Sequence, residues 1–237
     1  MHPTKRTAHV AGLLYLFVTI TGMFALMYVP GRLFVRGNSA ATANNILAHQ
    51  SLFMSDIVVG LVSELLFIAV VLVLYQLLKG VNQQHAALMV ILVLIDAPLA
   101  FLGAAFQMAT LAFLRGPDFL TVFNKPQRDA LAMLFFNLDK QVTIVSEIFW
   151  GLWLLPLGLL VFRSGFLPRF LGVWLIINGF AYVALSFTGL LLPQHVDMVF
   201  SIATPAFLGE MAFMLWLLIR GAKVQQSMSA PPATSLA

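Results

Sequence analysis

Long apolar stretches, separated by short groups of polar and charged residues, dominate the sequence. A helix that crosses a bilayer core of about 30 Å needs about 20 apolar residues, each adding about 1.5 Å. Stretches of that length predict six membrane-spanning helices, over residues 8–28, 55–78, 86–114, 141–162, 170–192 and 198–219. We therefore expect an all-α, polytopic bundle of six transmembrane helices that forms one domain over residues 1–224.

Two long connections on one side of the bundle carry helical signals of their own. Asn38 and Ser39 can cap a short helix before the second span, which predicts an interfacial helix on the membrane surface. Before the fourth span, Pro126 suits a first helical position, and apolar residues recur at helical spacing from Leu131 onward. This helix is expected to run into the fourth span. Residues 225–237 are rich in Ser, Ala and Pro and predict a disordered cytoplasmic tail.

Composition supports the membrane assignment and removes several other classes of protein. Hydrophobic residues make up 61% of the 237 residues and charged residues only 9%, whereas an ordinary soluble domain carries about 25% charged residues. This excludes a soluble enzyme domain and a disordered chain. The chain has no Cys, which excludes a disulfide scaffold and thiolate-bound metal centres. No cofactor is expected.

The basic residues lie at or near the ends of the predicted spans, where lipid headgroups can reach them. They form no clustered basic face, so we expect membrane lipids as partners and no nucleic acid. Six spans place both termini on one side, which holds seven of the 13 Lys and Arg residues in the shorter segments. The positive-inside rule then predicts that both termini are cytoplasmic.

Several segments, taken in order, resemble a known family. They are Ala41-Thr42-Ala43-Asn44-Asn45-Ile46-Leu47, Leu77-Leu78-Lys79-Gly80-Val81-Asn82, Phe162-Arg163-Ser164-Gly165-Phe166-Leu167-Pro168-Arg169-Phe170-Leu171-Gly172, and Pro205 followed by Leu208-Gly209-Glu210 and Leu215-Trp216-Leu217-Leu218-Ile219. Together they resemble the bacterial integral membrane proteins of the domain-of-unknown-function 4386 family, over about residues 8–221. The resemblance implies a small protein of the bacterial inner membrane. It implies no activity and no catalytic residues.

Four acids lie deep within the predicted spans: Glu64, Asp96, Glu147 and Glu210. An ionised carboxylate at the bilayer centre costs at least about 2.5 kcal/mol, so such side chains usually face the interior of the bundle. No Lys or Arg lies comparably deep. Asn178 and Gln107 can join the acids in a polar centre. We therefore predict that the protein binds or translocates a small solute or a proton through this centre.

Two alternatives stay open. In the first, each acid is a hydrogen-bonding strut between helices, and the protein is a structural or accessory component without chemistry. In the second, a metal-dependent hydrolase acts on lipids or headgroups at the outer face, where two His and three Asp residues could bind zinc and activate water. These residues are His49, Asp56, Asp139, His195 and Asp197. Their spacing matches no recognised metal-binding signature, so an enzyme is less favoured and no catalytic residue is predicted.

Overall fold

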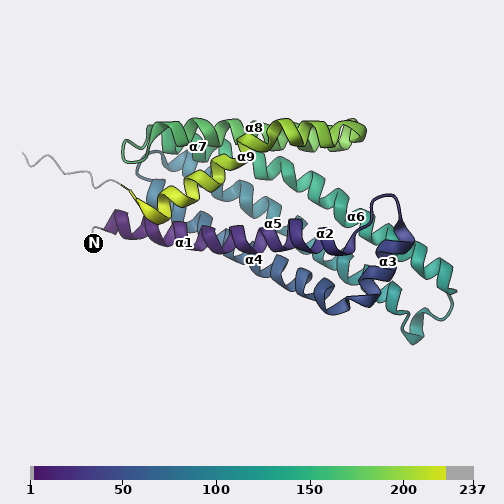
Figure 1. Ribbon diagram of the computed structural model, residues 1–237. Coiled ribbons are helices and arrows are strands. Elements are labelled where there is room, and N and C mark those ends of the chain that lie inside the picture. The colour runs from purple at the N-terminus through teal and green to yellow at the C-terminus, as the bar shows by residue number, and fades with distance from the viewer. Residues whose placement is uncertain (1–2, 223–237) are drawn as a thin grey trace, which may run out of the picture.

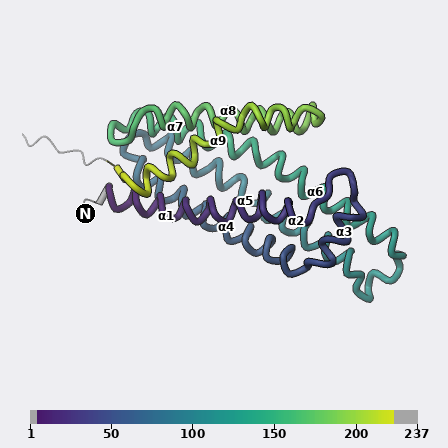
Figure 2. Tube along the Cα trace, in the orientation of Figure 1, coloured from purple at the N-terminus to yellow at the C-terminus, as the bar shows by residue number. Residues whose placement is uncertain are grey.

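The computed structural model describes residues 3–222, which form a bundle of long helices (Figures 1 and 2). No β-strand occurs within that range. The predicted tail over residues 225–237 lies outside the described residues. The elements are α1 (Pro3–Met23), η1 (Phe24–Tyr28), α2 (Val29–Leu33), α3 (Ser39–Ala48), α4 (Gln50–Leu78), α5 (Gln83–Arg115), η2 (Asp118–Leu120), α6 (Lys125–Leu152), α7 (Leu154–Arg163), α8 (Arg169–Leu191), η3 (Pro193–His195) and α9 (Val196–Ile219).

Six helical stretches within the described residues are long and apolar enough to cross a membrane. They are Lys5–Leu33, Gln50–Leu78, Gln83–Arg115, Lys125–Arg163, Arg169–Leu191 and Pro193–Ile219. The six-helix membrane bundle is therefore confirmed. Large apolar side chains such as Phe17, Leu65, Phe180 and Ile202 remain about half exposed or more, as expected of surfaces that face lipid.

The fourth stretch is the longest, with 39 residues. At about 1.5 Å per residue it measures about 58 Å, nearly twice the apolar thickness of a bilayer. The hairpin of α5 and α6 accordingly extends beyond the other helices, at the end that carries α3 and η2 (Figure 1). We call this end the loop end. The first and last described residues lie together at the opposite end, which we call the terminal end (Figure 1).

Both predicted loop helices are present. The Asn38 side chain accepts a hydrogen bond of 2.9 Å from the backbone N–H of Ala41, and this caps α3. Asn124 and Gln127 form a reciprocal capping box at the start of α6, which continues toward the terminal end as predicted. Each cap satisfies backbone donors that the first turn of a helix cannot pair internally.

Prolines account for two irregular places in the spanning helices. Pro156 lacks the N–H that would bond the carbonyl of Leu152, and the helix is interrupted there between α6 and α7. In the first span, the π-helical turn η1 ends just before Pro30, and the N–H of Val29 bonds the carbonyl of Phe24. Pro98, by contrast, lies within an uninterrupted α5.

The buried apolar side chains form two clusters, one toward each end of the bundle. The cluster at the terminal end joins α1, α4, α5, α7, α8 and α9. The cluster at the loop end joins α2, α3, α4, α5 and α6. Between them, α4, α5 and α6 bring polar side chains into the interior, and these form the candidate site.

Candidate functional site

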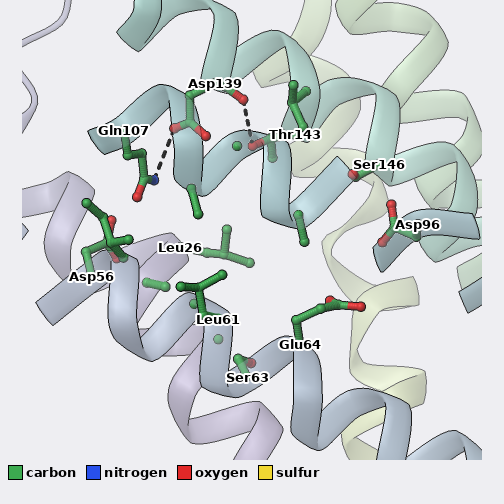
Figure 3. Close-up of a pocket in the computed structure, with 18 of the residues that line it drawn as sticks. Leu26, Asp56, Leu61, Ser63, Glu64, Asp96, Gln107, Asp139, Thr143 and Ser146 are labelled. Atoms are coloured by element: carbon green, nitrogen blue, oxygen red, sulfur yellow. Dashed lines mark hydrogen bonds between the residues drawn. The ribbon is translucent and has the colours of Figure 1, made fainter. Parts of the chain in front are cut away.

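A cavity of about 200 Å³ lies between the first span and helices α4, α5 and α6 (Figure 3). Four carboxyl groups line it: Asp56 and Glu64 from α4, Asp96 from α5 and Asp139 from α6. None of the described residues that line the cavity is Lys, Arg or His. A space of this size has room for several water molecules or a small solute.

Helical spacing explains why these side chains share one cavity. On α4, Asp56, Gly60 and Glu64 follow one another at intervals of four residues, so they lie on one face. On α5, Asp96, Ala100, Gly103 and Gln107 form the facing stripe, and on α6 the stripe is Asp139, Thr143, Ser146 and Trp150. Small residues in these stripes leave room between the helices. The polar stripes of α4 and α5 therefore line the cavity.

The end of the cavity nearer the loop end holds the first carboxyl pair, Asp56 and Asp139. The charge of Asp139 acts on Asp56. Gln107 donates a hydrogen bond of 3.1 Å from Nε2 to Oδ2 of Asp139, as Figure 3 shows. A Cβ atom added at Gly103 would lie 2.9 Å from Oδ1 of Asp139. The glycine therefore leaves the space that this carboxyl group occupies.

The second pair, Glu64 and Asp96, lies deeper, near the middle of α4 and α5 (Figure 3). The charge of Asp96 acts on Glu64. Trp150 donates a hydrogen bond of 2.9 Å from Nε1 to Oδ2 of Asp96. Ser146 approaches the same carboxyl group from the next turn of α6.

Three oxygens of these carboxyl groups are buried and have no hydrogen-bond partner among the described residues. They are Oδ1 of Asp56, Oε1 of Glu64 and Oδ1 of Asp96. Asp56 is 4% exposed and Asp96 is 3% exposed. A buried polar atom without a hydrogen-bond partner costs about 1–3 kcal/mol of stability. These oxygens therefore need a hydrogen-bond donor that the described side chains do not supply.

The basic residue nearest in sequence does not supply it. Lys140 follows Asp139 on α6, yet its ammonium group lies 4.2 Å from the centre of the Phe136 ring. Lys140 is exposed and is absent from the cavity lining. The carboxyl groups therefore face the cavity without a neighbouring cation within its wall.

Glu210 belongs to a separate polar group between α1, α8 and α9, which we call the Glu210 cluster (Tyr15, Asn178, Tyr182 and Glu210). The Tyr15 hydroxyl donates to Oε1 of Glu210. Asn178 donates from Nδ2 to Oε2 over 3.3 Å, and the Tyr182 hydroxyl approaches the same carboxyl group. Donors from two other helices thus surround the Glu210 side chain.

The six residues predicted to form one polar centre are divided in the structure. Glu64, Asp96 and Gln107 line the cavity, whereas Asn178 and Glu210 belong to the Glu210 cluster. Glu147 does not line the cavity. Its charge lies close enough to Tyr182 to affect that side chain. Their predicted role in binding or proton transfer stays a prediction.

The five candidate metal ligands are dispersed. Asp56 and Asp139 turn into the cavity, while Asp197 forms a bidentate pair with Arg36, with both N–O distances at 2.8 Å. His49 lies at the junction of α3 and α4, and His195 ends η3. Within residues 3–222, no group of three or more His, Asp or Glu side chains is arranged to hold a metal ion.

Comparison with known proteins decides the family. A family model matches residues 10–221, which is most of the chain. The chain belongs to the family described as domain of unknown function (DUF4386). The resemblance seen in the sequence motifs is thereby confirmed. Because the DUF4386 description names no activity, the chemistry of this chain has to be argued from its own residues.

One relative of this DUF4386 chain is a protein of Archaeoglobus fulgidus that is described as an uncharacterized protein. It is 33% identical over 90 residues, which cover 37% of this chain and 51% of the relative. The chain therefore matches about half the length of that relative. No solved structure matches the chain.

On α6 the cavity is lined by Asp139, Thr143, Ser146 and Trp150 and not by Lys140 or Glu147. The lining residues follow one another at steps of four, three and four, a helical spacing that is visible in the sequence. Nothing in the sequence singled out Tyr182, because an isolated tyrosine in an apolar helix has many uses.

Proposed function

We propose that this protein binds a small solute or protons in the carboxyl-lined cavity, as the intramembrane step in carrying them across the membrane. The observation that supports this is the set of buried carboxyl oxygens without partners, above all those of Asp56 and Asp96. Ionisable side chains within a membrane bundle are costly, and they commonly mark pathways for solutes, ions or protons.

The contrast with the Glu210 cluster strengthens the proposal. A carboxyl group that only ties helices together is expected to have its hydrogen bonds satisfied by neighbouring helices. Glu210 fits that description, since Tyr15, Asn178 and Tyr182 all contact it. Glu64 and Asp56 do not fit it. A structural role therefore accounts for the carboxyl group of Glu210 and leaves the carboxyl groups of the cavity unexplained.

Translocation also requires a route beyond the cavity. Toward the terminal end, the way is closed by fully buried side chains such as Val70, Leu74, Leu154 and Leu157. In this proposal the helices that carry them separate when the solute moves on. The π-helical turn η1 adjoins the cavity, and such turns recur at functional sites. We place the protein in the bacterial inner membrane, with both termini in the cytoplasm.

The access of the cavity to water can be tested by chemical labelling. Purified protein in lipid nanodiscs is treated with a water-soluble carbodiimide and an amine nucleophile, and modified carboxyl groups are located by mass spectrometry. We expect Asp56 and Asp139 to be modified, and Glu210 to be protected by the hydroxyl and amide groups around it. Protection of all four cavity carboxyl groups would indicate a dry core and contradict the proposal.

Transport is tested in parallel in proteoliposomes with an entrapped pH-sensitive dye. Wild-type protein is expected to dissipate an imposed proton gradient, or to do so when a transported solute is added. The double variant Asp56→Asn with Asp96→Asn should lose this activity. Asp118→Asn, the same change at an exposed site on η2, is the matched control and should retain it. Flux in the double variant equal to that of the control would contradict a role for the cavity.

A further inference from the structure

We propose that the solute is a linear diamine or polyamine, a chain with positively charged amino groups separated by methylene groups. This inference rests on the proposed function, because it names the class of solute for the same cavity. Three features of the cavity carry it: the sign of its charge, the separation of its carboxyl pairs and the apolar wall between them.

The charge of the lining favours a cation. Four carboxyl groups line the cavity, and no Lys, Arg or His does so among the described residues. An anionic solute would be repelled, and a neutral one would leave the carboxylates without a counter-charge. An ammonium group supplies both the charge and three N–H donors.

Hydrogen bonding favours the same class. Two donors in the lining are already committed, because Gln107 donates to Asp139 and Trp150 donates to Asp96. The oxygens left over are acceptors, one each on Asp56, Glu64 and Asp96. A solute that binds here therefore has to donate hydrogen bonds at more than one place.

The separation of the two pairs selects a chain with two cationic ends. Asp56 and Glu64 are eight residues apart on α4, which corresponds to about 12 Å along the helix axis. With the carboxyl groups taken to be as far apart as this rise of the backbone, and with each ammonium nitrogen about 2.8 Å inside its pair, the two nitrogens lie about 6 Å apart. A spacer of four or five methylene groups covers that distance.

The wall between the pairs is mainly apolar, with the hydroxyl groups of Ser63 and Thr143 among its leucine, alanine and glycine residues, and this suits methylene groups. Leu26 and Leu61 lie between the Asp56 end and the Glu64 end in Figure 3. A single metal ion fits the arrangement poorly, because no three of the His, Asp and Glu side chains in residues 3–222 are grouped to hold one. The spread of the carboxyl groups in two pairs thus points to an elongated organic cation.

The test measures binding to purified full-length protein in detergent by isothermal titration calorimetry. The probes are 1,4-diaminobutane, 1-aminobutane, 1,4-butanediol and butanedioate, which share a four-carbon chain and differ in their end groups. We expect the diamine to bind at least tenfold more tightly than the monoamine, and the diol and the dianion not to bind measurably. A series of diamines with three to eight carbons should show maximal affinity at four or five.

Variants test whether each carboxyl pair binds one end of the diamine. Removing the first pair (Asp56→Asn with Asp139→Asn) or the second pair (Glu64→Gln with Asp96→Asn) should each reduce diamine affinity to that of the monoamine. Asp118→Asn is the control and should bind like the wild type. The chain-length series needs no variant, so it decides the question even where a double variant fails to fold.

Equal affinity for the monoamine and the diamine, or no optimum in chain length, would overturn the inference. The outcomes also separate it from the proposed function. If no amine binds but proton flux depends on Asp56 and Asp96, the cavity carries protons, and only the inference fails. If neither binding nor flux is found, both fail.

Discussion

The same chemical change, a carboxylic acid replaced by its amide, is expected to have different effects on stability at Glu210 and at Glu64. Each is the fifteenth residue of its helix, in α9 and α4 respectively, so the two positions are matched in chemistry and place within the helix. They differ in their partners. Glu210 accepts hydrogen bonds from Tyr15 and Asn178, whereas Oε1 of Glu64 has no partner among the described residues.

Glu210→Gln should destabilise the bundle. Glutamine keeps one acceptor oxygen and presents an NH₂ group where the second was. Because Tyr15 and Asn178 donate to different oxygens of Glu210, at least one donor then faces another donor. An interhelical hydrogen bond in a membrane contributes about 0.6 kcal/mol, and an unpaired buried donor costs about 1–3 kcal/mol. We expect a loss of about 1–3 kcal/mol.

Glu64→Gln should leave stability unchanged or raise it. The substitution removes one of two carboxyl groups whose charges act on each other. Its new NH₂ group can donate to the free oxygen of Asp96. No hydrogen bond of the wild-type structure has to be lost, because Oε1 of Glu64 accepts none among the described residues.

The assay is thermal unfolding of the purified variants in one detergent, followed by tryptophan fluorescence. For a chain of this size, 1 kcal/mol corresponds to about 2–4 °C in melting temperature. Glu210→Gln should therefore melt several degrees below the wild type and Glu64→Gln should not. Equal melting temperatures for the two variants, or the reverse order, would refute the distinction between a structural acid and a cavity acid.

Three further substitutions test other parts of the structure, each by the same unfolding measurement. Gly12→Ala should destabilise by about 1–3 kcal/mol through overpacking, because the added Cβ would lie 2.5 Å from backbone atoms of α9; Gly31→Ala, where nothing lies within 4 Å, is its control and should be neutral. Trp150→Phe should lower stability because it removes the donor to Asp96, and an unchanged melting temperature would contradict that hydrogen bond. Arg36→Gln should have no measurable effect, since both side chains of its ion pair are largely exposed and such pairs contribute little; a clear loss would reveal a stabilising outer contact.

The helices themselves could be predicted because each depends on local patterns. Apolar length and the absence of charge define the six spans, and capping residues such as Asn38 and Asn124 define helix starts. Five of the six predicted spans lie within the observed helical stretches. The remaining one, residues 170–192, exceeds its helix by one residue, Leu192. The extent of α6 followed from the same kind of local pattern, because apolar residues that recur at helical spacing from Leu131 onward continue the helix into the fourth span.

The candidate site was predicted only in part. The depth of Glu64 and Asp96 in their spans marked them as interior groups, and helical spacing joined Asp96 to Gln107. Asp139 was expected at the outer boundary, whereas in the structure it lines the cavity beside Gly103. Whether Asp139 reaches the cavity depends on the height of α6 relative to its neighbouring helices, which no local pattern determines.

The sequence by itself determined that this chain crosses the membrane, how often it does so and that four of its acids lie deep within the spans, because hydrophobic length and charge are properties of each segment alone. Only the tertiary structure decided which acids have partners. Glu210 is surrounded by donors from α1 and α8, while Glu64 and Asp96 face a cavity. The reason is physical: a hydrogen bond between spans depends on the relative rotation and height of two helices, and these follow from the packing of the whole bundle.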